Sequence, residues 1–134
     1  MKKRSTLITF ILSILIIIVG YLAYIKYIRP TYLFNPTQTK EVVLGETNLI
    51  TLIKHTDQKD IFGIEIEVNG NSSGIFDMMV FNETGLVHTI ALKGEEVDYI
   101  YKNDWYSDTC FLKFIERDNA NGELSVEYRF LGLN

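Results

Sequence analysis

Hydrophobic residues follow two patterns along the chain, a continuous run near the N-terminus and an alternation with polar residues after it. The run covers residues 7–28 and reads LITFILSILIIIVGYLAYIKYI, with no charged residue before Lys26. As a helix rising 1.5 Å per residue, a segment of this length spans the ~30 Å hydrocarbon core of a bilayer. The pattern therefore predicts one transmembrane α-helix over residues 7–28. We expect it to end before Pro30, which lacks the amide hydrogen that would continue it.

The residue types along this run fit a membrane anchor. Its aliphatic side chains suit acyl chains, and the tyrosines near its C-terminal end suit the headgroup layer. A lysine at that level can extend its ammonium group to the bilayer surface. The residues expected to hold the anchor in the bilayer are Leu7, Ile16, Val19, Tyr24 and Lys26.

A cleaved secretory signal and a buried core helix are the alternatives to an anchor. The run is longer than the 7 to 15 apolar residues of a signal peptide, and bulky Tyr21 stands where a small residue would precede a cleavage site after Ala23. A core helix that is apolar on every side would need a larger protein to cover it. We therefore favour the anchor.

Basic residues on both sides of the run set its expected orientation. Lys2, Lys3 and Arg4 lie in a tail over residues 1–6, whereas Lys26 and Arg29 lie on the other side. The side with more Lys and Arg tends to stay in the cytoplasm. We expect a single-pass protein of a bacterial cell membrane, with a cytoplasmic N-terminus and an extracytoplasmic domain.

Beyond a linker over residues 29–40, apolar and polar residues alternate, which is the period of a β-strand with one buried face. The alternation is clearest in residues 64–68 and 124–130. Six less regular runs are also expected to be strands: Glu41–Leu44, Leu49–Lys54, Ile75–Phe81, Leu86–Leu92, Val97–Lys102 and Cys110–Ile115. About eight short strands separated by Gly- and Asn-rich turns predict an antiparallel β-sandwich over residues 41–134, in a mainly β protein.

The charge of the domain argues against nucleic-acid binding, and its single cysteine excludes an intramolecular disulfide. From Pro30 onward there are 8 Lys and Arg against 17 Asp and Glu, a formal charge of −9. A domain this acidic lacks the cations that bind a phosphate backbone, so we expect no nucleic-acid partner. Cys110 is the only cysteine and cannot form an intramolecular disulfide, so we expect it to be a small buried hydrophobic residue.

The segment Asn103–Asp108 is the most distinctive of the domain, because it holds the only tryptophan. Trp105 and Tyr106, flanked by Asp104 and Asp108, are the candidate binding residues, since such an aromatic pair could stack on a sugar ring or anchor a protein partner. The alternative is that Trp105 packs inward and the two aspartates bond to nearby backbone amides.

The sequence contains no clear set of catalytic or metal-binding residues. The carboxylates at Asp98, Asp104, Asp108, Glu116 and Asp118 lack the spacing of a calcium loop, so we expect no bound metal. His55 and His88 have no second ligand at metal spacing, and no hydrolase or nucleotide-binding motif is present. We expect no cofactor and no enzymatic activity.

Three functions stay open at this point. The first is a membrane-anchored β-sandwich that binds a protein or carbohydrate partner through the segment around Trp105. The second is a structural or accessory subunit of a larger membrane complex. The third, more remote, is a membrane-tethered hydrolase that uses Asp104 and Asp108.

Overall fold

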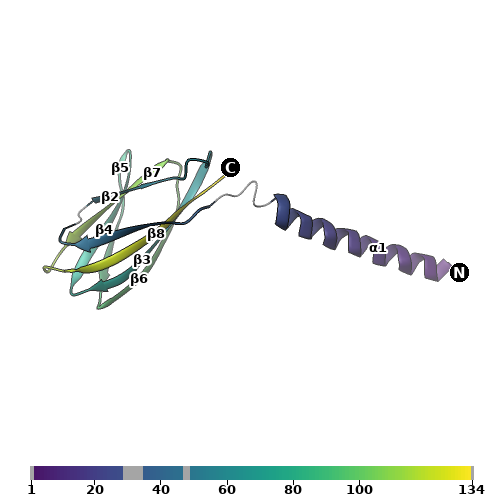
Figure 1. The fold of residues 1–134 in the computed structure, drawn as a ribbon, viewed down its shortest axis with the longest axis horizontal. Coiled ribbons are helices and arrows are strands. Elements are labelled where there is room, and N and C mark those ends of the chain that lie inside the picture. Colours follow the sequence, from purple (N-terminus) through teal and green to yellow (C-terminus); the bar gives the residue numbers. More distant parts are fainter. Residues whose placement is uncertain (1, 29–34, 47–48, 134) are drawn as a thin grey trace.

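The computed structural model describes residues 2–28, 35–46 and 49–133, and places them in one N-terminal helix and a two-layered β-sandwich (Figure 1). Helix α1 covers Lys2–Ala23 and continues as a π-helical turn, η1, over Tyr24–Ile28. Outside the described residues lie Met1, residues 47–48, Asn134 and residues 29–34, which include Pro30 and are half of the predicted linker.

The N-terminal helix is apolar along its length. Residues Ile8–Tyr27 form a stretch of 20 residues with a mean hydropathy of 2.6, none of it buried against the rest of the protein. Length and composition suffice to cross a membrane, although a signal sequence would look the same. The expected apolar helix is confirmed, and its role as an anchor is a question of function.

Eight strands form the domain, as predicted. They are β1 (Gln38–Leu44), β2 (Leu49–Ile53), β3 (Ile61–Ser72), β4 (Ile75–Asn82), β5 (Gly85–Lys93), β6 (Glu96–Asp104), β7 (Thr109–Glu116) and β8 (Gly122–Gly132). Strand β1 begins three residues earlier than predicted, inside the expected linker. Backbone pairing with β8 extends it there, and the Gln38 side chain bridges Tyr128 and the Ile53 carbonyl. An apolar alternation cannot reveal such a polar extension.

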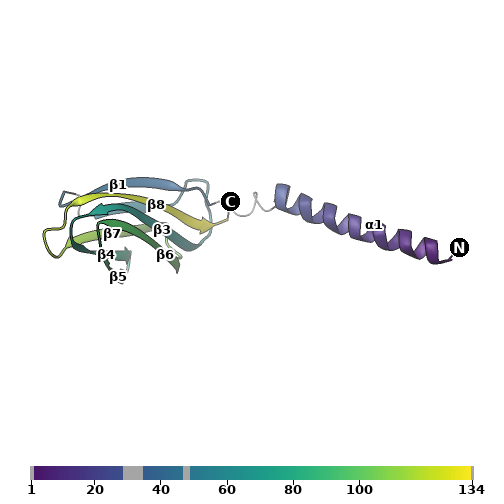
Figure 2. The same ribbon diagram turned by 90° about the horizontal axis from the view of Figure 1, so that it is seen from below.

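The strands form two antiparallel sheets, ordered β1-β8-β3-β6 and β2-β7-β4-β5. Figure 2 shows them as stacked layers. Every connection crosses from one sheet to the other except the β4–β5 turn, which joins neighbours. This is the strand order of a jelly roll. The predicted antiparallel β-sandwich is confirmed.

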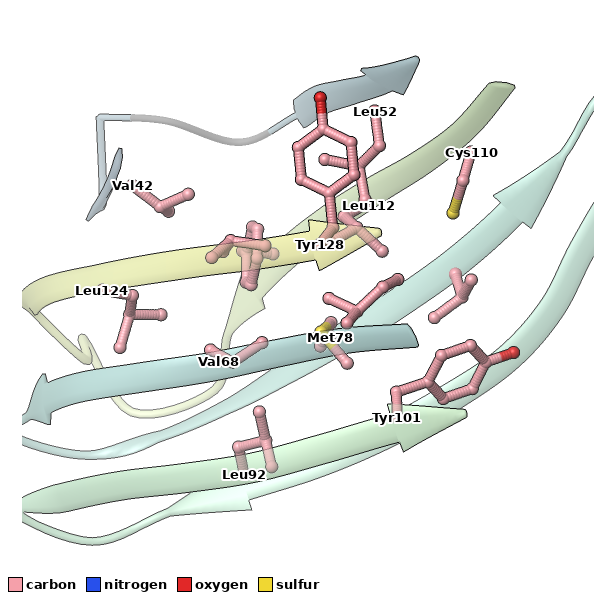
Figure 3. Packing of buried hydrophobic residues seen from close by; sticks show 14 of the residues in the cluster. Val42, Leu52, Val68, Met78, Leu92, Tyr101, Cys110, Leu112, Leu124 and Tyr128 are labelled. Atoms are coloured by element: carbon pink, nitrogen blue, oxygen red, sulfur yellow. The ribbon is translucent and has the colours of Figure 1, made fainter. Parts of the chain in front are cut away.

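The core lies between the sheets and takes alternate residues from each strand (Figure 3). Ile64, Ile66 and Val68 are fully buried on β3, as the sequence pattern predicts. Cys110 is also fully buried, and burial raises the pKa of its thiol to about 12. The thiol is therefore protonated at neutral pH, which confirms a packing position.

The outer face of the β1-β8-β3-β6 sheet is polar and acidic. Glu65 on β3 faces outward and forms ion pairs with Lys102 of β6, at 2.8 Å, and with Arg129 of β8. The hydrogen bond from Lys102 lowers the pKa of the Glu65 carboxyl, and Arg129 lowers it further against partial desolvation. These pairs link three neighbouring strands across the face.

The chain enters and leaves the sandwich at one end. The Gly132 amide donates to Asn35 Oδ1 at 3.0 Å, and Gln38 Nε2 donates to the Ile53 carbonyl at 3.0 Å. Strand register places the β2–β3, β4–β5 and β6–β7 connections at this end, since Ile53 pairs with Thr109 and Gly63 with Asp104. We call it the linker end. The other connections lie at the far end.

Two glycines test how closely β3 and β8 approach. Gly122 has φ +152°, and a Cβ there would lie 1.9 Å from the Asn71 carbonyl oxygen, whereas Gly85 has φ +138° and open space. Both Gly→Ala changes strain the backbone by about 1–3 kcal/mol. We expect Gly122→Ala to cost about 1–3 kcal/mol more, because it also pushes two strands apart.

Urea unfolding of the detergent-solubilised chain, followed by far-UV circular dichroism, measures this difference. Gly85→Ala is the matched control for backbone strain alone. Equal losses of stability in the two variants would show that β3 and β8 do not approach as closely as described.

Candidate functional site

The segment between β6 and β7 is held by its tryptophan. Trp105 is 3% exposed, its amide donates to the Phe62 carbonyl at 3.2 Å, and its Nε1 donates to the Thr109 carbonyl at 3.0 Å. The indole therefore packs inward and satisfies its only polar atom locally. The tryptophan part of the alternative that the sequence left open is therefore found, and it makes Trp105 a support for the loop. The Asp108 carboxylate, in contrast, pairs with Lys54 and, among the described residues, with no backbone amide.

Tyr106 follows Trp105 and points the other way, with 79% of its surface exposed. The two aromatic residues thus differ in role, because one fixes the loop and the other is presented by it. Asp104 precedes them as the last residue of β6 and is also exposed. Because buried Trp105 fixes the backbone of this segment, the segment itself loses little conformational freedom when a ligand binds.

The β4–β5 turn is the second part of the site. Asn82 Oδ1 accepts hydrogen bonds from the Thr84 amide at 2.9 Å, the Thr84 hydroxyl at 2.6 Å and the Gly85 amide at 3.1 Å. Such side-chain to backbone bonds fix a tight turn. The turn places Glu83 toward the segment that follows β6.

Glu83 joins the two parts. Its Oε1 atom accepts hydrogen bonds from the Ser107 hydroxyl at 3.4 Å and the Thr109 hydroxyl at 3.3 Å. The Ser107 hydroxyl also accepts a hydrogen bond from the Thr109 amide at 3.3 Å. The carboxylate is therefore oriented by partners from the opposite loop.

A pocket of about 280 Å³ lies between the turn and the loop. It offers a ring, two carboxylates, an amide and two hydroxyl groups in one concave surface, and Val87 adds an apolar contact. Its lining residues are Asn82, Glu83, Thr84, Val87, Asp104, Trp105, Tyr106 and Ser107. A few polar groups converging around an apolar surface are typical of small-ligand sites.

The structure brings together three of the four predicted binding residues. Trp105, Tyr106 and Asp104 line the pocket, whereas Asp108 does not. Asp108 instead pairs with Lys54 at 3.1 Å and accepts the Lys54 amide through its backbone carbonyl. The two aspartates of the hydrolase hypothesis thus face different surroundings.

The predicted anchor residues all lie on the N-terminal helix. Ile16 is 66% exposed, Val19 58% and Tyr24 50%, and Lys26 Nζ lies 5.4 Å from the centre of the Tyr27 ring. Leu7 is in α1, but its side chain is outside the described residues. Their role in a membrane stays a prediction.

A second hollow lies on the side of the sandwich. A larger and more open trough of about 640 Å³ runs between the edges of β5 and β6, where His88 Nδ1 and the Tyr101 hydroxyl lie 2.8 Å apart. Within the described ranges, no group of three His, Cys, Asp or Glu side chains could hold a metal ion. The pocket at the linker end has the denser set of ligand-facing polar groups.

Sequence reasoning missed the contribution of the β4–β5 turn. Asn82, Glu83 and Thr84 were interpreted only as a turn. A usable signal was present, because consecutive antiparallel strands place every second connection at the same end of a sandwich. Counting strands would therefore have put this turn beside the loop that contains Trp105.

Comparison with known proteins gives no family. No family model matches the chain, and no curated protein matches it. Among solved structures, the chain resembles the pre-peptidase C-terminal domain of a collagenase from Bacillus anthracis, with 13% identity and a TM-score of 0.43, over 71% of this chain and 89% of that one.

Two other solved structures resemble it to a similar degree. A structure from the disulfide-linked pili of Bacillus endospore appendages shares 15% identity with a TM-score of 0.42, covering 74% of this chain and 88% of that chain. A mutant family 29 carbohydrate-binding module shares 15% identity with a TM-score of 0.38, covering 77% and 76%. Likeness at this level carries no argument about function, so the site is interpreted from its own residues.

The division of roles between the two aromatic residues can be measured. Trp105→Phe removes the Nε1 donor and leaves the Thr109 carbonyl without it, so we expect a loss of about 1–3 kcal/mol of stability. Tyr106→Phe changes an exposed side chain and should alter stability by less than about 0.5 kcal/mol. Urea unfolding followed by circular dichroism tests both. A Trp105→Phe variant as stable as the parent would contradict the supporting role.

Proposed function

We propose that the chain is a membrane-anchored binding module whose pocket at the linker end binds a carbohydrate. The observation that carries the proposal is the combination of Tyr106, 79% exposed, with the oriented carboxylate of Glu83 in one pocket. The sandwich supplies a rigid support, and the segment around Trp105 presents the ring.

The chemistry of the lining matches that of a sugar. One face of a pyranose ring carries C–H groups that pack on an aromatic ring, while its edge carries hydroxyl groups. Carboxylates accept hydrogen bonds from those hydroxyls, and Ser and Thr hydroxyls can both donate and accept. Glu83, Asp104, Thr84 and Tyr106 all line the same 280 Å³ pocket, so the polar groups and the ring can contact one ligand.

The charge of the pocket disfavours an anionic ligand. Glu83 and Asp104 both line it, and the lining contains no Lys, Arg or His. A phosphate or a carboxylate would meet like charges in this pocket and would lose binding energy. A neutral sugar has no such cost.

The N-terminal helix supplies the attachment in this proposal. Ile8–Tyr27 is long and apolar enough to cross a bilayer, and none of it is buried within the described part of the protein. We propose that it remains in the mature protein as an anchor, with the N-terminus in the cytoplasm and the sandwich outside. The basic tail before the helix supports this orientation.

Binding of the solubilised chain to a glycan array, followed by calorimetry with the best neutral glycan, tests the proposal. We expect Tyr106→Ala to weaken binding about tenfold or more, which corresponds to about 1.4 kcal/mol. Tyr106→Phe keeps the ring and should bind within about threefold of the parent.

Leu49→Ala is the matched control, because Leu49 is 58% exposed and does not line the pocket. It should bind like the parent. If Tyr106→Ala bound the glycan as tightly as the parent, this pocket would not be the binding site. If the same pocket bound a protein and no glycan, the ligand would be a protein and the carbohydrate proposal would be wrong.

A further inference from the structure

The pocket lies at the end of the sandwich that the chain reaches first from the helix. Asn35 is held there by the Gly132 amide, and β1 starts beside Ile53. The β4–β5 turn and the loop that presents Tyr106 lie at the same end, because they follow strands β4 and β6, which run in the same direction. Entry point and pocket therefore share one end.

The connection to the helix is short compared with the domain. Seven peptide units join Ile28 to Asn35, and they span at most ~25 Å when fully extended at 3.6 Å each. Strand β8, with 11 residues, rises roughly 35 Å from one end of the sandwich to the other. A tether shorter than the domain cannot turn it upright with the pocket pointing away from the bilayer. The linker end must stay close to the membrane.

Exposed apolar side chains lie at both ends of the sandwich, but the exposed aromatic ones among the described residues of the domain, Phe62 and Tyr106, lie at or beside the linker end. Ile53 (54%), Phe62 (42%), Leu86 (51%) and Tyr106 (79%) are exposed at or beside the linker end. The exposed apolar side chains at the far end are aliphatic: Val43 (38%), Leu49 (58%) and Ile115 (39%). The described turns at the far end contain mostly Gly, Ser, Asn and charged residues. Exposed aromatic side chains such as Tyr106 are suited to the headgroup layer of a bilayer, where such rings are enriched.

Charge selects among the ligands that a bilayer can present. Besides the pocket carboxylates Glu83 and Asp104, the connections at the linker end carry Asp57, Asp60 and Asp108 against Lys54 and Lys59, so acidic residues outnumber basic ones there. An anionic phospholipid headgroup would be repelled by this set. A sugar headgroup without charge fits the pocket lining and the distance from the bilayer.

We infer that the ligand is the neutral sugar headgroup of a glycolipid, carried by the same bilayer that holds the anchor. The inference rests on the proposed function, in both its anchor and its carbohydrate pocket. It adds that the ligand is bound in the plane of the membrane, and that sugars on a facing surface are out of reach.

Nanodiscs allow a direct test with the full chain. The chain is reconstituted in phosphatidylcholine discs, in discs that also contain glucosyl or galactosyl diacylglycerol, and in discs that contain phosphatidylglycerol. Amide NMR signals of residues 82–84 and 104–107 report on the pocket. We expect them to shift with the glycolipids and to stay unchanged with phosphatidylcholine or phosphatidylglycerol. Tyr106→Ala should abolish the shifts, and Leu49→Ala should keep them.

Two further arms separate the inference from the proposed function. Glycolipid supplied on separate vesicles should not shift the signals, whereas a variant with 30 Gly and Ser residues inserted after residue 34 should gain this response and lose about tenfold in apparent affinity within the disc. Three results would overturn the inference and leave the carbohydrate pocket in place. They are an equal response to glycolipid in the same disc and on separate vesicles without the insertion, the same shifts with phosphatidylglycerol, and binding of soluble glycans alone. No response to any sugar, soluble or lipid-borne, would overturn both.

Discussion

The direction of the chain reverses at every connection of the sandwich, and this reversal decides which loops can meet. Strands β1, β3, β5 and β7 run away from the linker end, and the other four run back to it. Three connections and both ends of the domain therefore collect at one end. Two strands, β5 and β6, separate the β4–β5 turn from the β6–β7 loop, and this even number brings both to the linker end. With an odd number of strands between them they would lie at opposite ends, and the pocket would not form.

Burial of alternate residues fixes this arrangement. The inward residues of both sheets share one core, in which Ile64, Phe76 and Phe130 are fully buried. A shift of one residue in any strand would expose its apolar face and bury its polar one, so the register is strongly specified. The same register sets Asp104 opposite Gly63 and brings Phe81 beside Phe111, which places the ends of β6 and β4 at the pocket.

Much of the fold could be predicted from the sequence, because alternation and turn residues are local signals. All eight strands follow from them, as does the apolar helix. The site is less accessible from sequence, since it depends on which way single side chains point. Trp105 and Tyr106 are adjacent in sequence, yet the Trp105 indole is buried and donates to the Thr109 carbonyl, whereas Tyr106 is exposed. The pairing of Asp108 with Lys54 joins distant residues and leaves no local pattern.

In the proposed arrangement, the linker end of the sandwich, which bears the pocket, lies next to the membrane. The most direct measurement is paramagnetic broadening of amide NMR signals by gadolinium-labelled lipid headgroups, with the full chain in nanodiscs. We expect strong broadening at the linker end, at residues 54–60, 82–84 and 105–108, and little at the far end, at residues 73–74, 94–95 and 117–121. Equal broadening at both ends, or stronger broadening at the far end, would contradict it.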